Sequence, residues 1–222
     1  MTYFLWDWNG TLLDDTQAAL DTLNEMLSRR GRPPIGMDFY RDNFAFPVKP
    51  FYESIGVRLD NEDWEALARE YHEVYGRQSK RLNSGAIAAL EHAKACSAGQ
   101  SIISALRQDI LERDAARFGA APYMEHIYGV DNLDGASKSA RAVELVRRVK
   151  AERRGADVNF VLIGDSLHDK EVADAIGVRC VLCSQGSHAG WRLSAAAPTG
   201  ATLDDAVSMA LSGLYVRTGG AR

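Results

Sequence analysis

The sequence predicts an α/β protein with a doubly wound parallel sheet that is interrupted once by an all-helical insertion. From residue 84 onward, short apolar runs alternate with helical patterns, which is typical of a parallel sheet covered on both faces. An isolated apolar run, Tyr3 to Trp6, has strand character and precedes a segment with helical periodicity only. We therefore expect a core made of residues 1–14 and 84–222, with a helical cap domain at residues 15–83.

Two apolar stripes predict the helices of the inserted segment. Leucines from Leu20 to Leu27 recur at helical spacing, and Gly31 ends that pattern. A second helix is expected at residues 61–81, where aromatic and aliphatic residues recur from Trp64 to Tyr75. This second stripe fits either the core of the cap or a dimer face. Residues 42–50 are predicted to form a loop between the helices.

The rest of the chain is predicted to alternate between strands and helices. The further strands are expected at residues 101–104, 126–130, 158–163 and 178–182. The further helices are expected at residues 86–95, 109–118, 137–154, 168–176 and 203–214. Ligands of an open parallel sheet bind at the carboxyl ends of its strands, so the residues directly after each strand are the first candidates for a site.

Composition and charge exclude several functional classes. The 222 residues carry a net charge of −4, without the basic excess expected of a nucleic-acid or membrane-surface binder. There is neither a long apolar span nor a signal peptide pattern, which predicts a cytoplasmic protein. Three cysteines make no disulfide framework, and Cys180 and Cys183 should point to opposite faces of a strand rather than chelate a metal.

Residues suited to phosphoryl chemistry follow the predicted strands. They are Asp7, Ser104, Lys138, Asp165 and Asp169. An aspartate at the end of the first strand can attack phosphorus and form an acyl-phosphate. The spaced pair of later acids offers the hard oxygen ligands that Mg²⁺ prefers. The hydroxyl, the lysine and the backbone amides after the first acid are expected to hold phosphate oxygens. A lysine at a helix N-terminus also indicates an anion nearby, because the helix dipole disfavours a cation there.

These residues resemble the four motifs of the haloacid dehalogenase-like superfamily, in order. The stretch from Asp7 to Leu12 is similar to motif one, Ser104 to motif two, Lys138 to motif three, and Gly164 to Asp169 to motif four. The resemblance covers nearly the whole chain and is strongest to phosphoglycolate phosphatase-like members, which have a Rossmann-like core and a helical cap. It implies a nucleophile at Asp7 and a magnesium-dependent reaction.

The resemblance also assigns the remaining site residues. The implied catalytic residues are Asp7, Asn9, Ser104 and Lys138. The implied phosphate-binding residues are Gly10, Thr11, Ser104, Ala105, Lys138 and Lys49. The implied Mg²⁺ ligands are Asp7, Asn9 through its backbone carbonyl, Asp165 and Asp169. The expected reaction is hydrolysis of a small phosphorylated metabolite, a phosphate monoester, through a phospho-Asp7 intermediate, by a monomer or a homodimer.

One position departs from the pattern of the family. Its phosphatases carry a second aspartate two residues after the nucleophile, and this acid protonates the leaving group. Here the position is Asn9, whose amide has no titratable proton. Three functions stay open, and the first is a phosphatase that is slower or selective for good leaving groups, with proton transfer by His168 or a cap residue. The second is phosphonoacetaldehyde hydrolase-like C–P cleavage, in which Lys49 forms a Schiff base. The third is a phosphate- or partner-binding module of low turnover.

Residues beside these motifs are predicted to have structural roles. Trp6 and Trp8 alternate with the nucleophile and should pack in the core. Asp15 is interpreted as a helix cap and linker residue, and His168 as a solvent-facing residue at a helix start. His188 follows the last predicted strand and is a candidate for the border of the site.

Overall fold

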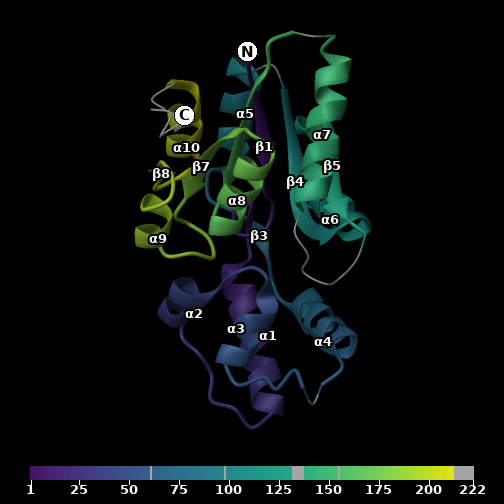
Figure 1. The fold of residues 1–222 in the computed structure, drawn as a ribbon, viewed down its shortest axis with the longest axis vertical. Helices are drawn as coiled ribbons and strands as arrows, with labels where there is room; N and C mark the ends of the chain where they lie inside the picture. Colours follow the sequence, from purple (N-terminus) through teal and green to yellow (C-terminus); the bar gives the residue numbers. More distant parts are fainter. Residues whose placement is uncertain (61, 98, 132–137, 155, 213–222) are drawn as a thin grey trace, which may run out of the picture.

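A parallel sheet of six strands runs through the upper part of the molecule in Figure 1, in the order β5-β4-β1-β6-β7-β8. The computed structural model describes residues 1–60, 62–97, 99–131, 138–154 and 156–212. The strands are β1 (Thr2–Trp6), β4 (Gly99–Arg107), β5 (His126–Val130), β6 (Asn159–Gly164), β7 (Arg179–Cys183) and β8 (Thr199–Gly200). Because β1 lies in the middle, the first strand is hydrogen-bonded on both sides, to β4 and to β6.

Two hydrophobic clusters cover the two faces of this sheet. One face carries α5 (Ala86–Cys96), α6 (Gln108–Arg117) and α10 (Leu203–Ser212). The other carries α7 (Ser139–Glu152), α8 (Leu167–Ala175) and α9 (Gly190–Ser194). Alternation along β1 divides its side chains, so that Phe4 and Trp6 pack in the first cluster and Tyr3 and Leu5 in the second. The predicted doubly wound α/β class is confirmed.

The helices α1 to α4 gather around a third hydrophobic cluster, at the end of the molecule remote from the N-terminus (Figure 1). They are α1 (Thr16–Arg29), α2 (Met37–Asn43), α3 (Val48–Ser54) and α4 (Trp64–Arg77). Two short antiparallel strands flank this group, β2 (Leu13–Asp14) and β3 (Arg81–Leu82). We call these four helices the α1–α4 group. Trp64 and Tyr71 pack against its core, so the α4 stripe faces inward.

The structure corrects several expected element boundaries. Residues 42–50 are not a single loop, because α2 ends and α3 begins within them. Pro50 lies in the first turn of α3, where a missing N–H costs no helical hydrogen bond. Helix α4 begins at Trp64, since the Asp63 carboxylate caps it by accepting from the Glu65 amide. Strand β4 continues past residue 104, with an irregular register between Ile103 and Arg107.

The buried tryptophans and cysteines have the structural roles predicted for them. Trp6 and Trp8 are fully buried in the cluster beneath α5 and α10. Cys180 and Cys183 lie in opposite clusters, as expected of strand residues three apart. Within the described chain, no helix has the length and apolar character needed to cross a membrane.

Candidate active site

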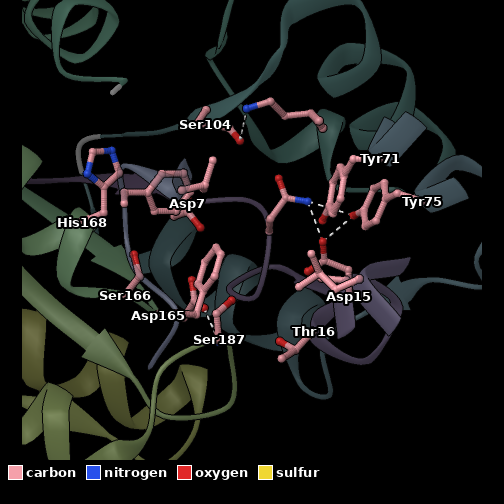
Figure 2. Close-up of a pocket in the computed structure, with 18 of the residues that line it drawn as sticks. Asp7, Asp15, Thr16, Tyr71, Tyr75, Ser104, Asp165, Ser166, His168 and Ser187 are labelled. Carbon is pink, nitrogen blue, oxygen red and sulfur yellow. Dashed lines mark hydrogen bonds between the residues drawn. The ribbon is translucent and has the colours of Figure 1, made fainter. Parts of the chain in front are cut away.

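A cavity lies between the carboxyl ends of the strands and the α1–α4 group. Figure 2 shows Asp7 near its centre, with Ser104, His168 and Asp165 on one side and Tyr71, Tyr75 and Asp15 on the other. The Asp7 amide continues the β1–β6 ladder by one bond, donating to the Ile163 carbonyl at 2.9 Å. The nucleophile predicted from sequence therefore lies directly past the last pair of the central strand.

Lys138 links two of the predicted acids. Its Nζ contacts Oδ1 of Asp7, lies 2.6 Å from Oδ1 of Asp169 and 3.3 Å from the carbonyl oxygen of Ile103. The three charged residues are 6 % exposed or less. A lysine ammonium has three donors, and all three have a partner here. Lys138 is thus the buried counter-charge of the site, at the N-cap position of α7.

Asp169 is fixed by the start of its own helix. Its Oδ2 accepts from the hydroxyl of Ser166 at 2.6 Å, from the Ser166 amide at 3.0 Å and from the Asp165 amide at 3.2 Å. Together with the Ser166 side chain this forms a capping box at the first turn of α8. These bonds fix one carboxylate oxygen and direct the other at Lys138.

Asp165 is held from two loops. Its Oδ2 accepts from the Ser187 amide at 2.6 Å, and its Oδ1 accepts from the Thr11 hydroxyl at 3.1 Å. A side-chain Cβ at Gly10 or at Gly186 would lie 2.2 Å from Oδ2 of this carboxylate. Gly10 also has φ +78°, which favours glycine. The close approach of both loops to Asp165 therefore depends on these two glycines.

The three buried carboxylates have one ammonium among them. Ligand oxygens of Asp7, Asp165 and Asp169 all lie within 4.8 Å of one another. Burial raises the pKa of Asp7 to about 7, although Lys138 opposes this, and burial and the charge of Asp7 raise the pKa of Asp165. For Asp169, burial raises the pKa but Lys138 more than offsets it. With all three ionised, two negative charges are uncompensated, so this set of hard oxygen donors fits a divalent cation such as Mg²⁺.

Asn9 is bound to Asp15 and Tyr75 rather than to the nucleophile. Its Nδ2 donates to Oδ2 of Asp15 at 2.6 Å and to the hydroxyl oxygen of Tyr75 at 3.0 Å. An amide nitrogen has two hydrogens, and both are used in these bonds. Asn9 lines the cavity, but it has neither a titratable proton nor a spare N–H for a leaving group.

The sequence suggested that the Asp15 side chain caps α1, but the structure shows that it does not. Asp15 occupies the N-cap position without a side-chain cap bond. Its carboxylate instead accepts from Asn9, from the Gly10 amide at 2.7 Å and from the Tyr75 hydroxyl. Burial raises the pKa of Asp15, and these donors oppose that rise. Asp15 thus joins the motif-one loop to α4 through Tyr75.

The structure gathers most of the predicted site residues but not all of them. Ser104, Ala105 and Lys138 line the cavity. Gly10 and Thr11, two of the predicted phosphate-binding residues, are not among its lining residues. The Gly10 amide donates to Asp15 and to the Leu13 carbonyl, and the Thr11 hydroxyl bridges Asp7 and Asp165. Gly10 and Thr11 therefore help to position the carboxylates of Asp15, Asp7 and Asp165 without lining the cavity themselves.

Lys49 also lies outside the site. Its side chain is exposed, and its Nζ lies 4.7 Å from the centre of the Trp64 ring. It is not among the residues that line the cavity. The expected role of Lys49 in binding phosphate or forming a Schiff base has no support in this arrangement.

The two histidines near the site are both buried. His168, predicted to face solvent, is 7 % exposed and stacks on Phe46 with ring centroids 4.7 Å apart. Burial and then the charge of Lys138 lower its pKa. His188 accepts from the Leu167 amide through Nδ1 at 3.1 Å and so supports the motif-four turn. Burial lowers the pKa of His188 to about 4, so this histidine is neutral near pH 7.

Sequence reasoning missed the residues that come from the loops and from α4. Ser187 was overlooked, although its neighbour His188 was noted in the loop after β7. Tyr75 was interpreted only as part of an apolar stripe. The hydroxyl of a tyrosine at the end of a helical stripe gives no sequence signal that it reaches a catalytic loop.

The helical side of the cavity is mainly aromatic. Its aromatic side chains are Tyr40, Phe44, Phe46, Tyr52, Trp64, Tyr71 and Tyr75. Aliphatic residues complete this wall, among them Ala19, Leu23 and Ala68. These aromatic and aliphatic side chains face the charged residues at the sheet edge. One end of the cavity is therefore polar and the other is apolar.

Known proteins are similar to this chain in sequence and in fold. The chain is 26 % identical to the phosphoglycolate phosphatase of Caulobacter vibrioides over 81 % of this chain and 78 % of that protein. It is 24 % identical to the phosphoglycolate phosphatase of Rhodobacter capsulatus over 82 % of this chain and 84 % of that protein. A haloacid dehalogenase-like hydrolase structure from Streptococcus pneumoniae superposes with a TM-score of 0.74 at 16 % identity, covering 94 % of this chain and 98 % of that one.

A family assignment follows from the extent of the match. Residues 4–183 match the haloacid dehalogenase-like hydrolase family, a range that contains Asp7, Ser104, Lys138 and both acids of motif four. The residues that the structure brings together at the strand ends all lie within the matched range. The chain belongs to the haloacid dehalogenase-like hydrolases.

Proposed function

We propose that this protein is a magnesium-dependent phosphatase, which hydrolyses a small phosphate monoester through a phosphorylated Asp7. The observation that carries the proposal is the pairing of Asp7 with Lys138 beside two further buried acids, at the polar end of a cavity large enough for a substrate. A buried carboxylate held by an ammonium is an oriented nucleophile. The names of the two phosphatase relatives agree with this reaction class.

The first chemical step is attack of an Asp7 oxygen on phosphorus. The P–O bond to the leaving group breaks as the acyl-phosphate bond forms, and the leaving group departs with the bonding electrons. Lys138 and the hydroxyl of Ser104 lie where they would compensate charge on phosphate oxygens. Asp7, Asp165 and Asp169 would hold Mg²⁺, which when bound supplies positive charge against the phosphate dianion. Water then hydrolyses the acyl-phosphate and restores Asp7.

The α1–α4 group is proposed to act as the cap, with residues 15–83 as the inserted domain. Support comes from its separate hydrophobic cluster and from the paired strands β2 and β3 at the connection. Closure of such a lid excludes water from the reacting groups. C–P cleavage through Lys49 is not favoured, because that lysine is exposed away from the cavity. A pure binding role would leave the buried nucleophile and its lysine without a purpose.

The test is phosphate release from a panel of phosphate esters, with excess Mg²⁺ or with EDTA. Wild-type protein should release phosphate only with Mg²⁺, and Asp7→Asn should reduce release by a factor of about 10⁴ or more. The exposed acid Asp204, which lies on α10, provides the control variant Asp204→Asn, which should retain activity. Equal release by wild type and Asp7→Asn would overturn the proposal.

A further inference from the structure

Resting on the phosphatase function above, we propose that the substrate is an aryl phosphate, a monoester whose phosphate is carried directly by an aromatic ring. Three independent features of the cavity support this: the chemistry of its wall, the absence of a proton donor at Asn9, and unpartnered polar atoms at its far end.

The wall opposite the acids suits a flat apolar group. Tyr71 and Tyr75 stack with ring centroids 5.6 Å apart and nearly parallel planes, while Phe44 meets Phe46 edge to face. Aromatic rings bind other rings favourably in both geometries. The cavity measures about 180 Å³. A cavity of roughly 150 Å³ is large enough to accept benzene, so a single ring fits.

The charge of the same wall disfavours a small acidic leaving group. Among the described lining residues, the part contributed by α1 to α4 has neither lysine nor arginine. Its one charged residue of fixed sign is Asp15, whose carboxylate would repel a second anion. A glycolate leaving group carries such an anion and would have no cation to pair with on this side; on the other side, Arg107 of β4 lines the cavity but is paired with Asp109. The wall therefore selects against phosphoglycolate although two relatives bear its name.

The leaving group must also depart without help from residue 9. Both amide hydrogens of Asn9 are donated to Asp15 and Tyr75, and the Tyr75 hydroxyl donates to Asp15 in turn. A phenol has a pKa of about 10, whereas the pKa of an aliphatic alcohol is far higher and resembles that of water. A phenolate is therefore expelled far more readily than an alkoxide when no acid protonates the oxygen.

The far end of the cavity offers hydrogen bonds to a substituent on the ring. Thr16 and Trp64 both line the cavity, and within the described chain the Thr16 hydroxyl and the Trp64 Nε1 are buried without a hydrogen-bond partner. Thr16 is only 4 % exposed. A buried polar atom without a partner is costly, so these two atoms mark where a polar substituent would bind. An aryl phosphate with a hydroxyl, carbonyl or amide group on the ring would satisfy them.

The first experiment compares four substrates with wild-type protein and Mg²⁺. Acetyl phosphate is the reference, since its leaving group is acetate and needs neither a ring pocket nor a proton. Phenyl phosphate has the ring and a good leaving group, benzyl phosphate has the ring but an alkoxide leaving group, and phosphoglycolate has neither. We expect kcat/KM for phenyl phosphate to exceed that for phosphoglycolate about 100-fold or more. Benzyl phosphate should bind but turn over slowly.

Asn9→Asp separates the leaving-group effect from the ring effect. The added acid should raise kcat for benzyl phosphate by about 10²-fold and change kcat for phenyl phosphate much less, because only the alkoxide needs a proton. Equal gains for both esters would overturn the leaving-group argument.

The ring pocket is tested on α4. Ala68→Phe fills the cavity from its wall, and Ala66→Phe makes the same change at an exposed position of the same helix that does not line the cavity. The ratio of phenyl phosphate to acetyl phosphate turnover should fall at least tenfold in the first variant and stay at its wild-type value in the second.

An inhibitor comparison needs no variant: phenylphosphonate should inhibit acetyl phosphate hydrolysis at least tenfold more strongly than methylphosphonate.

The outcomes distinguish the two proposals. Mg²⁺-dependent acetyl phosphate hydrolysis that depends on Asp7, with phosphoglycolate preferred over phenyl phosphate, would overturn the aryl proposal alone. Equal inhibition by the two phosphonates would do the same. Absence of phosphate release from all four substrates would overturn the phosphatase function and the aryl proposal together.

Discussion

At the level of single residues, the chemistry of the site depends on charges that water barely reaches. Asp7, Asp165 and Asp169 share one ammonium, Lys138, and each carboxylate is oriented by donors of its own. Burial makes each ionised acid costly and makes each counter-charge effective. The burial of three carboxylates beside one ammonium is therefore costly to the fold unless a cation binds among them.

Asp165→Asn should gain stability in the absence of Mg²⁺ and lose cation binding. Its carboxyl has a pKa raised by burial and then by the Asp7 charge, so it stabilises the fold at low pH and loses that contribution as pH rises above the ordinary value of about 3.9. In EDTA, the variant's Tm should equal or exceed the wild-type Tm, with a difference that grows from pH 4 to pH 8.

The companion measurement for Asp165→Asn is calorimetry with Mg²⁺. Wild type should gain on the order of 2–3 kcal/mol of stability at saturating Mg²⁺, and the variant should lose that gain. Asp204→Asn, at an exposed position, should behave like wild type. A full Mg²⁺ effect in Asp165→Asn would show that this carboxylate is not a ligand.

Gly186→Ala should damage the site through one methyl group. Its Cβ would lie 2.2 Å from Oδ2 of Asp165, so the loop or the carboxylate must shift. We expect a loss of about 1–3 kcal/mol and a higher Mg²⁺ concentration for half-maximal activity. Gly190→Ala is the matched control, because the nearest atom to its Cβ is the Ser184 Cβ at 3.4 Å. Urea denaturation and Mg²⁺ titration of both variants would decide; identical behaviour would refute the steric argument.

At the level of elements, the helices that flank the cavity are joined by a partly buried ion cluster. Arg30, at the end of α1, donates to Glu62 at 2.5 to 3.0 Å and to Glu70 of α4 at 2.7 Å. These side chains are 19 to 28 % exposed. The cluster fixes α4 on α1, and α4 carries both Tyr71 and Tyr75 to the cavity. The position of the aromatic wall thus depends on this contact.

Arg30→Gln should loosen α4. Burial raises the pKa of Glu70, but Arg30 and then Arg29 more than offset it, so the net pKa is lowered. A carboxylate with a lowered pKa stabilises the fold above about pH 4.3 and loses that contribution as pH falls further. The variant should be about 1–2 kcal/mol less stable at pH 7, with a smaller difference below pH 4.

The control for the ion cluster is Arg69→Gln. Arg69 is 61 % exposed and makes only longer ion pairs, at 3.5 Å to Glu65 and 3.7 Å to Asp63. Its replacement should change stability by less than about 0.5 kcal/mol. Urea unfolding of the two variants at pH 7 and pH 3.5 measures both effects. Equal losses at pH 7 would mean that the Arg30 cluster contributes nothing beyond a surface pair.

At the level of the whole molecule, hydrogen bonds between described residues join the α1–α4 group to the sheet core at two places, in addition to ring contacts such as that of Phe46 with His168. One is the connection through β2 and β3, together with the Asn9, Asp15 and Tyr75 contact. The other is between α2 and the loop before α9, where Arg192 donates to the carbonyls of Arg41 and Phe44 at 2.8 and 3.0 Å. The second contact lies across the cavity from the connection and closes it.

Arg192→Ala should therefore favour an open arrangement of the proposed cap. Loss of two hydrogen bonds from a charged donor should raise the amide exchange rates in α2 by about tenfold or more. Hydrogen exchange read by mass spectrometry over residues 37–43 measures this. Arg148→Ala, on α7, is the control and should leave α2 unchanged. Unaltered exchange in Arg192→Ala would show that this contact does not keep the group closed.

Much of the architecture follows from local patterns. The alternation of short apolar runs and helical stripes predicted the parallel sheet, because each strand buries both faces and each helix only one. Helices α2 and α3 were not predicted, since seven-residue helices have too few turns to show a period. The strands β2 and β3 were missed for the same reason, being two residues long.

The sequence by itself determined that Asp7, Lys138 and the acid pair of Asp165 and Asp169 lie together, because residues at the carboxyl ends of parallel strands meet at one edge of the sheet. It also determined that Asn9 lacks a proton. Only the tertiary structure decided that Lys49 stays outside the cavity, that His168 is buried, and that Asp15 and Tyr75 use both hydrogens of Asn9. These contacts join segments whose approach depends on how the helical group packs on the core, and no local pattern encodes that packing.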